Sequence, residues 1–217
     1  MLRRLALGGL VAASLCVPAW AGVGLSAGAG TLGLSLTLSV SIVRGWVDAR
    51  LLANGGRITR HEMTDGLNYQ GRAHFRNAAL LADITPFGGV FHVTGGVYYD
   101  DNRVDLTGTP VNGAYTVNGY TVPAAVVGPV TGTITYARFA PYLGLGLSND
   151  GGVGAGLAYG VDLGVMWDHP TTTLSAPGAA YDPALAFEIA AVRAQIEQQA
   201  SRLKAYPVIS VSLGYRF

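Results

Sequence analysis

The sequence is poor in cysteine, histidine and charge. It has one cysteine, Cys16, and four scattered histidines, so no spacing suggests a disulfide, a thiol nucleophile or a metal site. Only 12% of the residues are charged and the formal net charge is +1, which gives no basic field for nucleic acid. We therefore expect no cofactor, no metal ion and no nucleic-acid partner.

Long apolar runs are missing as well, except at the N-terminus. The apolar stretch 5–17 follows two arginines and ends in a small-x-small pattern at 19–21, which is typical of a secretory signal peptide. It is too short for a membrane-spanning helix. We expect a signal peptide over 1–21 and one mature domain over 22–217 that contains no cysteine.

What the chain does have is alternation with a period of two. In 207–217, large apolar residues alternate with serine, glycine and arginine; they are Ile209, Val211, Leu213, Tyr215 and Phe217. Such a strand suits a closed barrel in lipid, with apolar residues toward the acyl chains and the others toward the lumen. Leu213, Tyr215 and Phe217 resemble the C-terminal assembly signal of Gram-negative outer-membrane barrels. That resemblance implies the barrel-assembly machinery as a partner during biogenesis.

Similar segments recur along the mature chain and number about eight. We predict an all-β fold, a transmembrane antiparallel up-and-down β-barrel of about eight strands. If the last strand ends at the periplasmic side, the alternating direction of the strands assigns each connection to one side of the membrane. The short connections 41–45, 85–89 and 148–152 are then periplasmic. The long connections 54–71, 106–132 and 168–206 are external. This assignment holds only if 22–28 is a separate first strand.

The last long loop departs from alternation. Asp182 and Pro183 are suited to begin a helix. Apolar residues then follow at helical spacing, namely Leu185, Ile189, Val192, Ile196 and Leu203. We predict an amphipathic helix over 183–204 whose stripe packs on the rim of the barrel or on neighbouring loops. A docking or self-association surface is the alternative.

The second long loop contains a hairpin signal. Asn118-Gly119 favours a tight turn between alternating β-formers at 114–122. We expect the hairpin to extend two barrel strands. Alternatively, Tyr115 and Tyr120 stand outside the cell and recognise a partner.

Alternation also selects side chains that face the lumen. The predicted polar network consists of Asp48, Arg50, Asn77, Asp83, His92, Arg138, Tyr142 and Asp162, joined by Arg216 near the end of the chain. Turn geometry places Arg138 opposite Asp162, Asp83 opposite His92, Ser39 opposite Asp48, and Thr37 opposite Arg50. Charges enclosed in a narrow barrel must be paired or hydrated. We interpret the set as a structural network that closes the lumen, with a narrow polar pore as the alternative.

No ordered nucleophile, base and orienting group is visible, so we predict no catalytic residues and no enzyme activity. Polar residues expected near the outer rim are His61, His74, Asp100, Asp101, His169 and Ser175. Residues distant in sequence can still meet in space, so an outer-membrane lipid-modifying or proteolytic enzyme stays an alternative.

Several segments in a fixed order resemble a family of small proteobacterial outer-membrane β-barrel proteins. They are 79–83, 86–89, 95–99, 139–146, 161–165 and 206–217. More distantly, the chain is similar to OmpA/OmpX-type barrels. The resemblance implies a location and a fold and adds no chemistry.

The sequence therefore predicts a protein of the Gram-negative outer membrane, with a filled lumen and a structural or surface-interaction role. Its expected partners are outer-membrane lipid and lipopolysaccharide. An external ligand could contact the loops 55–71, 107–131 and 168–205.

Overall fold

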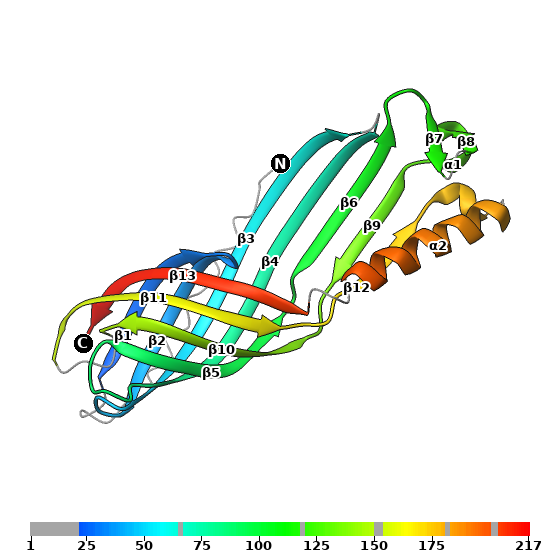
Figure 1. The fold of residues 1–217 in the computed structure, drawn as a ribbon. Helices are drawn as coiled ribbons and strands as arrows, with labels where there is room; N and C mark the ends of the chain where they lie inside the picture. The colour runs from blue at the N-terminus through cyan, green and yellow to red at the C-terminus, as the bar shows by residue number, and fades with distance from the viewer. Residues whose placement is uncertain (1–21, 65–66, 118–119, 150–153, 181–182, 201–203) are drawn as a thin grey trace, which may run out of the picture.

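The computed structural model describes residues 22–64, 67–117, 120–149, 154–180, 183–200 and 204–217. The predicted signal peptide, 1–21, lies outside these ranges. The chain forms a closed antiparallel barrel with an extension at one end (Figure 1). The ring contains, in spatial order, β1 (Val23–Gly30), β2 (Gly33–Val43), β3 (Val47–Thr64), β4 (Leu67–Ile84), β5 (Phe91–Asp100), β10 (Phe139–Ser148), β11 (Gly156–Trp167) and β13 (Ala205–Arg216). Strands β13 and β1 pair and close the barrel, which confirms the predicted fold and the separate first strand.

The extension continues two barrel strands well beyond the ring. Strands β3 and β4 have 18 residues each and stay paired to the contact between Thr64 and Leu67. The outer half of β4 then pairs with β6 (Arg103–Pro110), which pairs with β9 (Val130–Thr135) and through it with β12 (Thr171–Ser175). The expectation that 54–71 is a loop is wrong, because backbone hydrogen bonds to β4 and β6 keep this segment in the sheet.

Small elements cover the far end of this extension. They are the hairpin β7 (Ala114–Val117) and β8 (Tyr120–Pro123), the short helix α1 (Ala124–Val127), the 3₁₀ turn η1 (Pro177–Ala180) and the helix α2 (Pro183–Ala200). The helix predicted in the last loop is confirmed, and it lies against β12 and η1. No helix in the described ranges is long and apolar enough to cross a membrane.

A small apolar cluster joins these elements. Ile189 of α2 packs against Tyr115, Val127 and Ala176. Tyr115 is buried, and its hydroxyl lies within hydrogen-bond distance of the carbonyl oxygens of Gly108 and Gly128, at 3.0 and 2.9 Å. The alternative in which Tyr115 recognises a partner is therefore wrong. The expectation that the hairpin extends two barrel strands is wrong as well, because β7 and β8 form a two-stranded sheet of their own. The turn residues of this hairpin, 118–119, and the expected helix ends, Asp182 and Leu203, lie outside the described residues.

The barrel is apolar outside and largely polar inside. Leu34 and Leu163 point outward and are 71% and 59% exposed, whereas His92 and Thr94 point inward and are almost fully buried. Such an exposed apolar wall belongs in lipid. Outward aromatic residues gather at both ends of the wall: Tyr99, Phe139 and Trp167 lie near the extension, and Trp46, Phe87, Tyr159, Tyr215 and Phe217 lie at the opposite end. They form the two aromatic girdles expected at membrane interfaces.

Candidate functional site

Arg50 of β3 is the centre of the polar network inside the barrel. Its Nε lies 2.6 Å from Oδ2 of Asp83 on the neighbouring strand β4. Its Nη1 donates to Oδ2 of Asp162 at 3.0 Å, on strand β11 at the opposite side of the ring. Its Nη2 donates to Oδ1 of both carboxylates, at 2.8 and 2.9 Å. One buried guanidinium thus joins the two walls of the lumen through charge-assisted hydrogen bonds.

Neighbouring side chains complete this network. The hydroxyl of Thr94 donates to Oδ1 of Asp83 at 2.7 Å, and Nε2 of His92 lies 2.9 Å from Oδ1 of Asp162. Strand β10 provides Gly146 between His92 and Asp162. A Cβ atom at Gly146 would lie 2.3 Å from Nε2 of His92, so only glycine leaves room for this contact.

The same histidine connects a serine to an acid. The hydroxyl of Ser148 lies 3.3 Å from Nδ1 of His92, so Ser148, His92 and Asp162 form a hydrogen-bonded series. These residue types could in principle activate a nucleophile. Here the carboxylate also accepts hydrogen bonds from Arg50, and the imidazole is only 2% exposed. The series is thus joined to the buried ion network.

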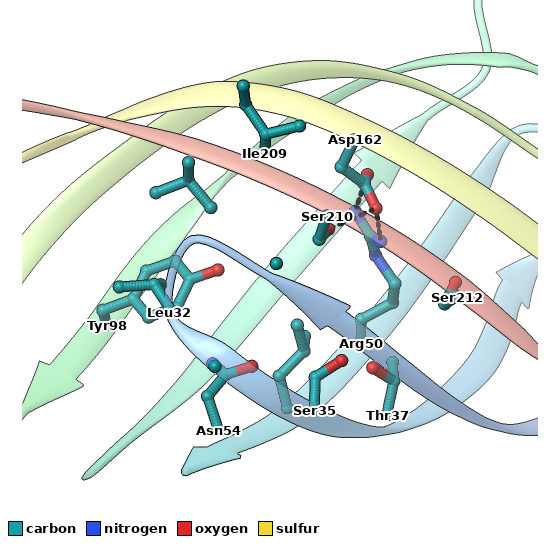
Figure 2. Close-up of a pocket in the computed structure, with 14 residues that line it drawn as sticks. Leu32, Ser35, Thr37, Arg50, Asn54, Tyr98, Asp162, Ile209, Ser210 and Ser212 are labelled. Carbon is teal, nitrogen blue, oxygen red and sulfur yellow. Dashed lines mark hydrogen bonds and ion pairs between the residues drawn. The ribbon is translucent and has the colours of Figure 1, made fainter. Parts of the chain in front are cut away.

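An apolar layer lies on the extension side of the ion network. Leu32, Leu52, Leu81, Tyr98, Tyr142, Met166 and Val208 form one buried cluster across the lumen. The rings of Tyr98 and Tyr142 meet edge to face with centroids 5.4 Å apart. The cavity between this layer and Arg50 measures about 20 Å³, room for about one water molecule (Figure 2). Two stacked layers of side chains, one ionic and one apolar, thus cross the lumen.

Amides and carboxyls line the junction between barrel and extension. Asn54 donates to Asn77, whose side chain donates in turn to Asn102, at 2.6 and 3.2 Å. Asn102 donates to both carboxylate oxygens of Asp100, which interacts with the carboxyl group of Asp168. Both aspartates are buried, and Oδ2 of Asp168 has no hydrogen-bond partner among the described residues.

Most of the predicted lumen residues are buried in the barrel. They are Asp48, Arg50, Asn77, Asp83, His92, Tyr142 and Asp162, with Arg216 at the end away from the extension. Arg138 is the exception, because it precedes β10 and is exposed. Its predicted pairing with Asp162 is therefore wrong, and Arg50 takes its place.

The predicted cross-strand partners are displaced by a few residues. Asp83 lies opposite Thr94, not His92, and Ser41 and Ser39 lie opposite Asp48 and Arg50. These displacements result from the positions and lengths of the connections between strands. The β10–β11 connection is centred near Gly154 and not on Asp150, the β4–β5 connection extends to Val90, and a bulge interrupts β2 near its end.

Sequence reasoning missed several residues of the site, namely Asn54, Thr94, Asn102, Ser148 and Asp168. Thr94 lies two residues after His92 on β5, so its side chain faces the lumen as well. This alternation is the sequence feature that could have revealed it. Asp168 follows the last outward residue of β11, Trp167, and its contact with Asp100 depends on long-range pairing.

The rim residues predicted as candidates are spread over the extension and the junction: His61, His74 and Ser175 lie on three different strands. His74 and Asp101 border one open hollow, Asp100 is buried, and the backbone N–H of His169 donates to Asp168. In the described part of the chain no three potential metal ligands come together.

Comparison with known proteins supports the fold. No protein-family model matches the sequence, and no curated protein does either. The crystal structure of CarO2 from Acinetobacter baumannii is similar, with a TM-score of 0.63 and 22% identity over 90% of this chain and 98% of that chain. The crystal structure of CarO from the same organism gives a TM-score of 0.62 and 25% identity over 90% of this chain and 97% of that chain. The further similarity to OmpA/OmpX-type barrels gains no support from these matches. The chain is an outer-membrane β-barrel protein with an eight-stranded ring, the fold of the two CarO structures.

Proposed function

We propose that this protein is a closed outer-membrane barrel that holds its sheet extension at the cell surface for interaction with other molecules. The observation that carries the proposal is the ion network of Arg50, Asp83 and Asp162, which crosses the lumen from one wall to the other. An eight-stranded barrel has an interior just wide enough for side chains. A network of this kind therefore blocks a path for solutes.

The asymmetry of the two ends supports the orientation. The strands at the Phe217 end are joined by short connections, whereas the opposite end carries the whole extension. Outer-membrane barrels have short periplasmic turns and longer external loops. The extension accordingly faces the outside of the cell, where it offers a paired, folded surface in place of three flexible loops.

Recording from planar lipid bilayers tests the closed lumen. The refolded wild-type protein should give no steady conductance steps. A double variant, Arg50→Ser with Tyr98→Ala, removes one bulky group from each lumen layer and should conduct if it still folds. Steady steps from the wild-type protein would contradict the proposal and favour the narrow pore.

Lipid A composition tests the enzyme alternative. Profiles from cells with and without the protein should be identical. A modified lipid A species that requires the chain would replace the surface-interaction role with catalysis.

A further inference from the structure

The extension sheet has two faces that continue the two sides of the barrel wall. In β3, even-numbered residues such as Arg50 and Leu52 face the lumen, and odd-numbered residues such as Leu51 face lipid. Because side chains alternate along a strand, the odd-numbered residues beyond the ring lie on the continuation of the lipid-facing side. Residues paired across neighbouring strands share a face, so the register defines this outer face on β4 and β6 as well.

The outer face changes from apolar to basic where the strands leave the ring. Arg57 on β3 lies opposite His74 on β4, and His74 lies opposite Arg103 on β6. The neighbouring row adds Arg72, opposite Asp105. Arg76 lies one pair closer to the membrane, and its side chain is 85% exposed. We call Arg57, Arg72, His74, Arg76 and Arg103 the basic patch.

Two carboxylates lie beside the basic patch and leave it positively charged. Asp101 is 4.0 Å from Nη1 of Arg76, a loose exposed pair. Asp105 accepts hydrogen bonds from Nε of Arg103 and from Thr133, at 2.8 and 2.9 Å. Burial acts to raise the pKa of Asp105, but these hydrogen bonds and the nearby positive charge outweigh it and lower the pKa. Asp105 therefore stays ionised, and it holds Arg103 in place while leaving part of its guanidinium available.

The depth of the basic patch identifies its partner. Tyr99 and Phe139 pack edge to face in the girdle near the extension, with ring centroids 5.6 Å apart. Tyr99 pairs with Ala78, two residues before Arg76 along the outward direction of β4. The basic patch thus begins immediately above the aromatic girdle, at the level of lipid head groups. It borders an open hollow of about 690 Å³.

We propose that the basic patch binds the phosphate groups of the outer-leaflet glycolipid, lipopolysaccharide. Guanidinium groups bind phosphate through paired hydrogen bonds, and a lateral row of them suits a head group held at a fixed depth. The glycolipid's acyl chains would then lie along the apolar wall below, on Leu80 and Leu51. The inference rests on the external orientation in the proposed function, but it does not depend on whether the lumen conducts.

Binding of purified lipid A to the full chain in detergent tests this inference. The probes are bisphosphorylated lipid A and the same lipid after removal of both phosphates. The variant Arg57→Gln/Arg103→Gln removes two charges from the basic patch. The control Arg60→Gln/Arg193→Gln removes two charges elsewhere, because Arg60 lies on the opposite face of the same strand and Arg193 lies on α2. Heat-dependent gel mobility verifies that each variant is folded.

We expect the patch variant to bind bisphosphorylated lipid A about tenfold more weakly, the control variant to bind it like the wild type, and binding to weaken with salt. Equal binding of the dephosphorylated lipid, or an unaffected patch variant, would overturn the inference. Full competition by millimolar inorganic phosphate would also overturn it, since the site would then be one for free anions. Conductance by the wild-type barrel would contradict the proposed function alone and leave the binding result intact.

Discussion

At the scale of single residues, Arg50 neutralises the buried carboxylates of Asp83 and Asp162 in the lumen. Replacing it with alanine leaves Asp83 and Asp162 buried without their cation. Removing one partner of a buried ion pair costs about 3–5 kcal/mol. We predict that Arg50→Ala lowers the free energy of unfolding by an amount in this range, measured from tryptophan fluorescence during urea unfolding in detergent.

Arg138→Ala is the matched control for this prediction. Arg138 has the same charge but is exposed outside β10, so its loss should change the free energy of unfolding by less than about 0.5 kcal/mol. An equal decrease in the free energy of unfolding for the two variants would show that the buried ion pairs of Arg50 do not stabilise the barrel.

Alternation identified the inward side chains because the period of a strand is two residues in any sheet. It could not identify their partners. A partner depends on the length of each connection, and glycine-rich connections such as that around Gly154 give no fixed length from sequence. This is why Arg138 was paired with Asp162, whereas the actual cation, Arg50, comes from a strand on the other side of the ring. Sequence neighbours do not specify contacts across a lumen.

At the scale of elements, the pair Asp100 and Asp168 joins the end of β5 to the segment after β11. Both carboxyl groups are buried and interact electrostatically, and one oxygen of Asp168 has no partner among the described residues. Two adjacent carboxylates repel each other when both are ionised. Asp168→Asn would remove that repulsion, and its amide could donate to Asp100 where the unpartnered oxygen now lies.

We predict that Asp168→Asn raises the free energy of unfolding by about 1–2 kcal/mol at neutral pH. The gain should shrink in acid, where protonation relieves the repulsion in the wild type as well. The measurement is urea unfolding at two pH values. Asp101→Asn, an exposed residue next in sequence to Asp100, is the control and should be neutral. A loss of stability in Asp168→Asn would mean that the carboxylate is needed in its ionised form.

The strands of the barrel and the helix of the last loop were predictable, and the sheet of the extension was not. Barrel strands carry one apolar face throughout, as in β11. The helix at 183–200 begins at Pro183, directly after Asp182 in the sequence, and has apolar residues at spacings of three and four. The outer half of β3 contains Arg57, Arg60, His61 and Glu62, which read as a solvated loop. Its strand conformation comes from pairing with β4, and the sheet gains β6, β9 and β12 from distant parts of the chain.

At the scale of the whole molecule, the two ends of the barrel differ in composition as well as in length. The lumen is ionic around Arg50, apolar around Tyr98 and Tyr142, and lined with amides at the junction. Beyond the ring, the side that was lipid-facing turns basic. The proposed orientation, with this basic side outside the cell, can be measured directly.

Single cysteines provide that measurement, because Cys16 is the only cysteine and lies in the predicted signal peptide. Thr109→Cys places a thiol on β6 of the extension, and Gly89→Cys places one in the exposed connection before β5. On intact cells, a membrane-impermeant maleimide should label Thr109→Cys and spare Gly89→Cys. After the outer membrane is permeabilised, both should react, while the wild type stays unlabelled throughout. The reverse pattern would place the extension in the periplasm and remove the basis for both the surface role and the glycolipid site.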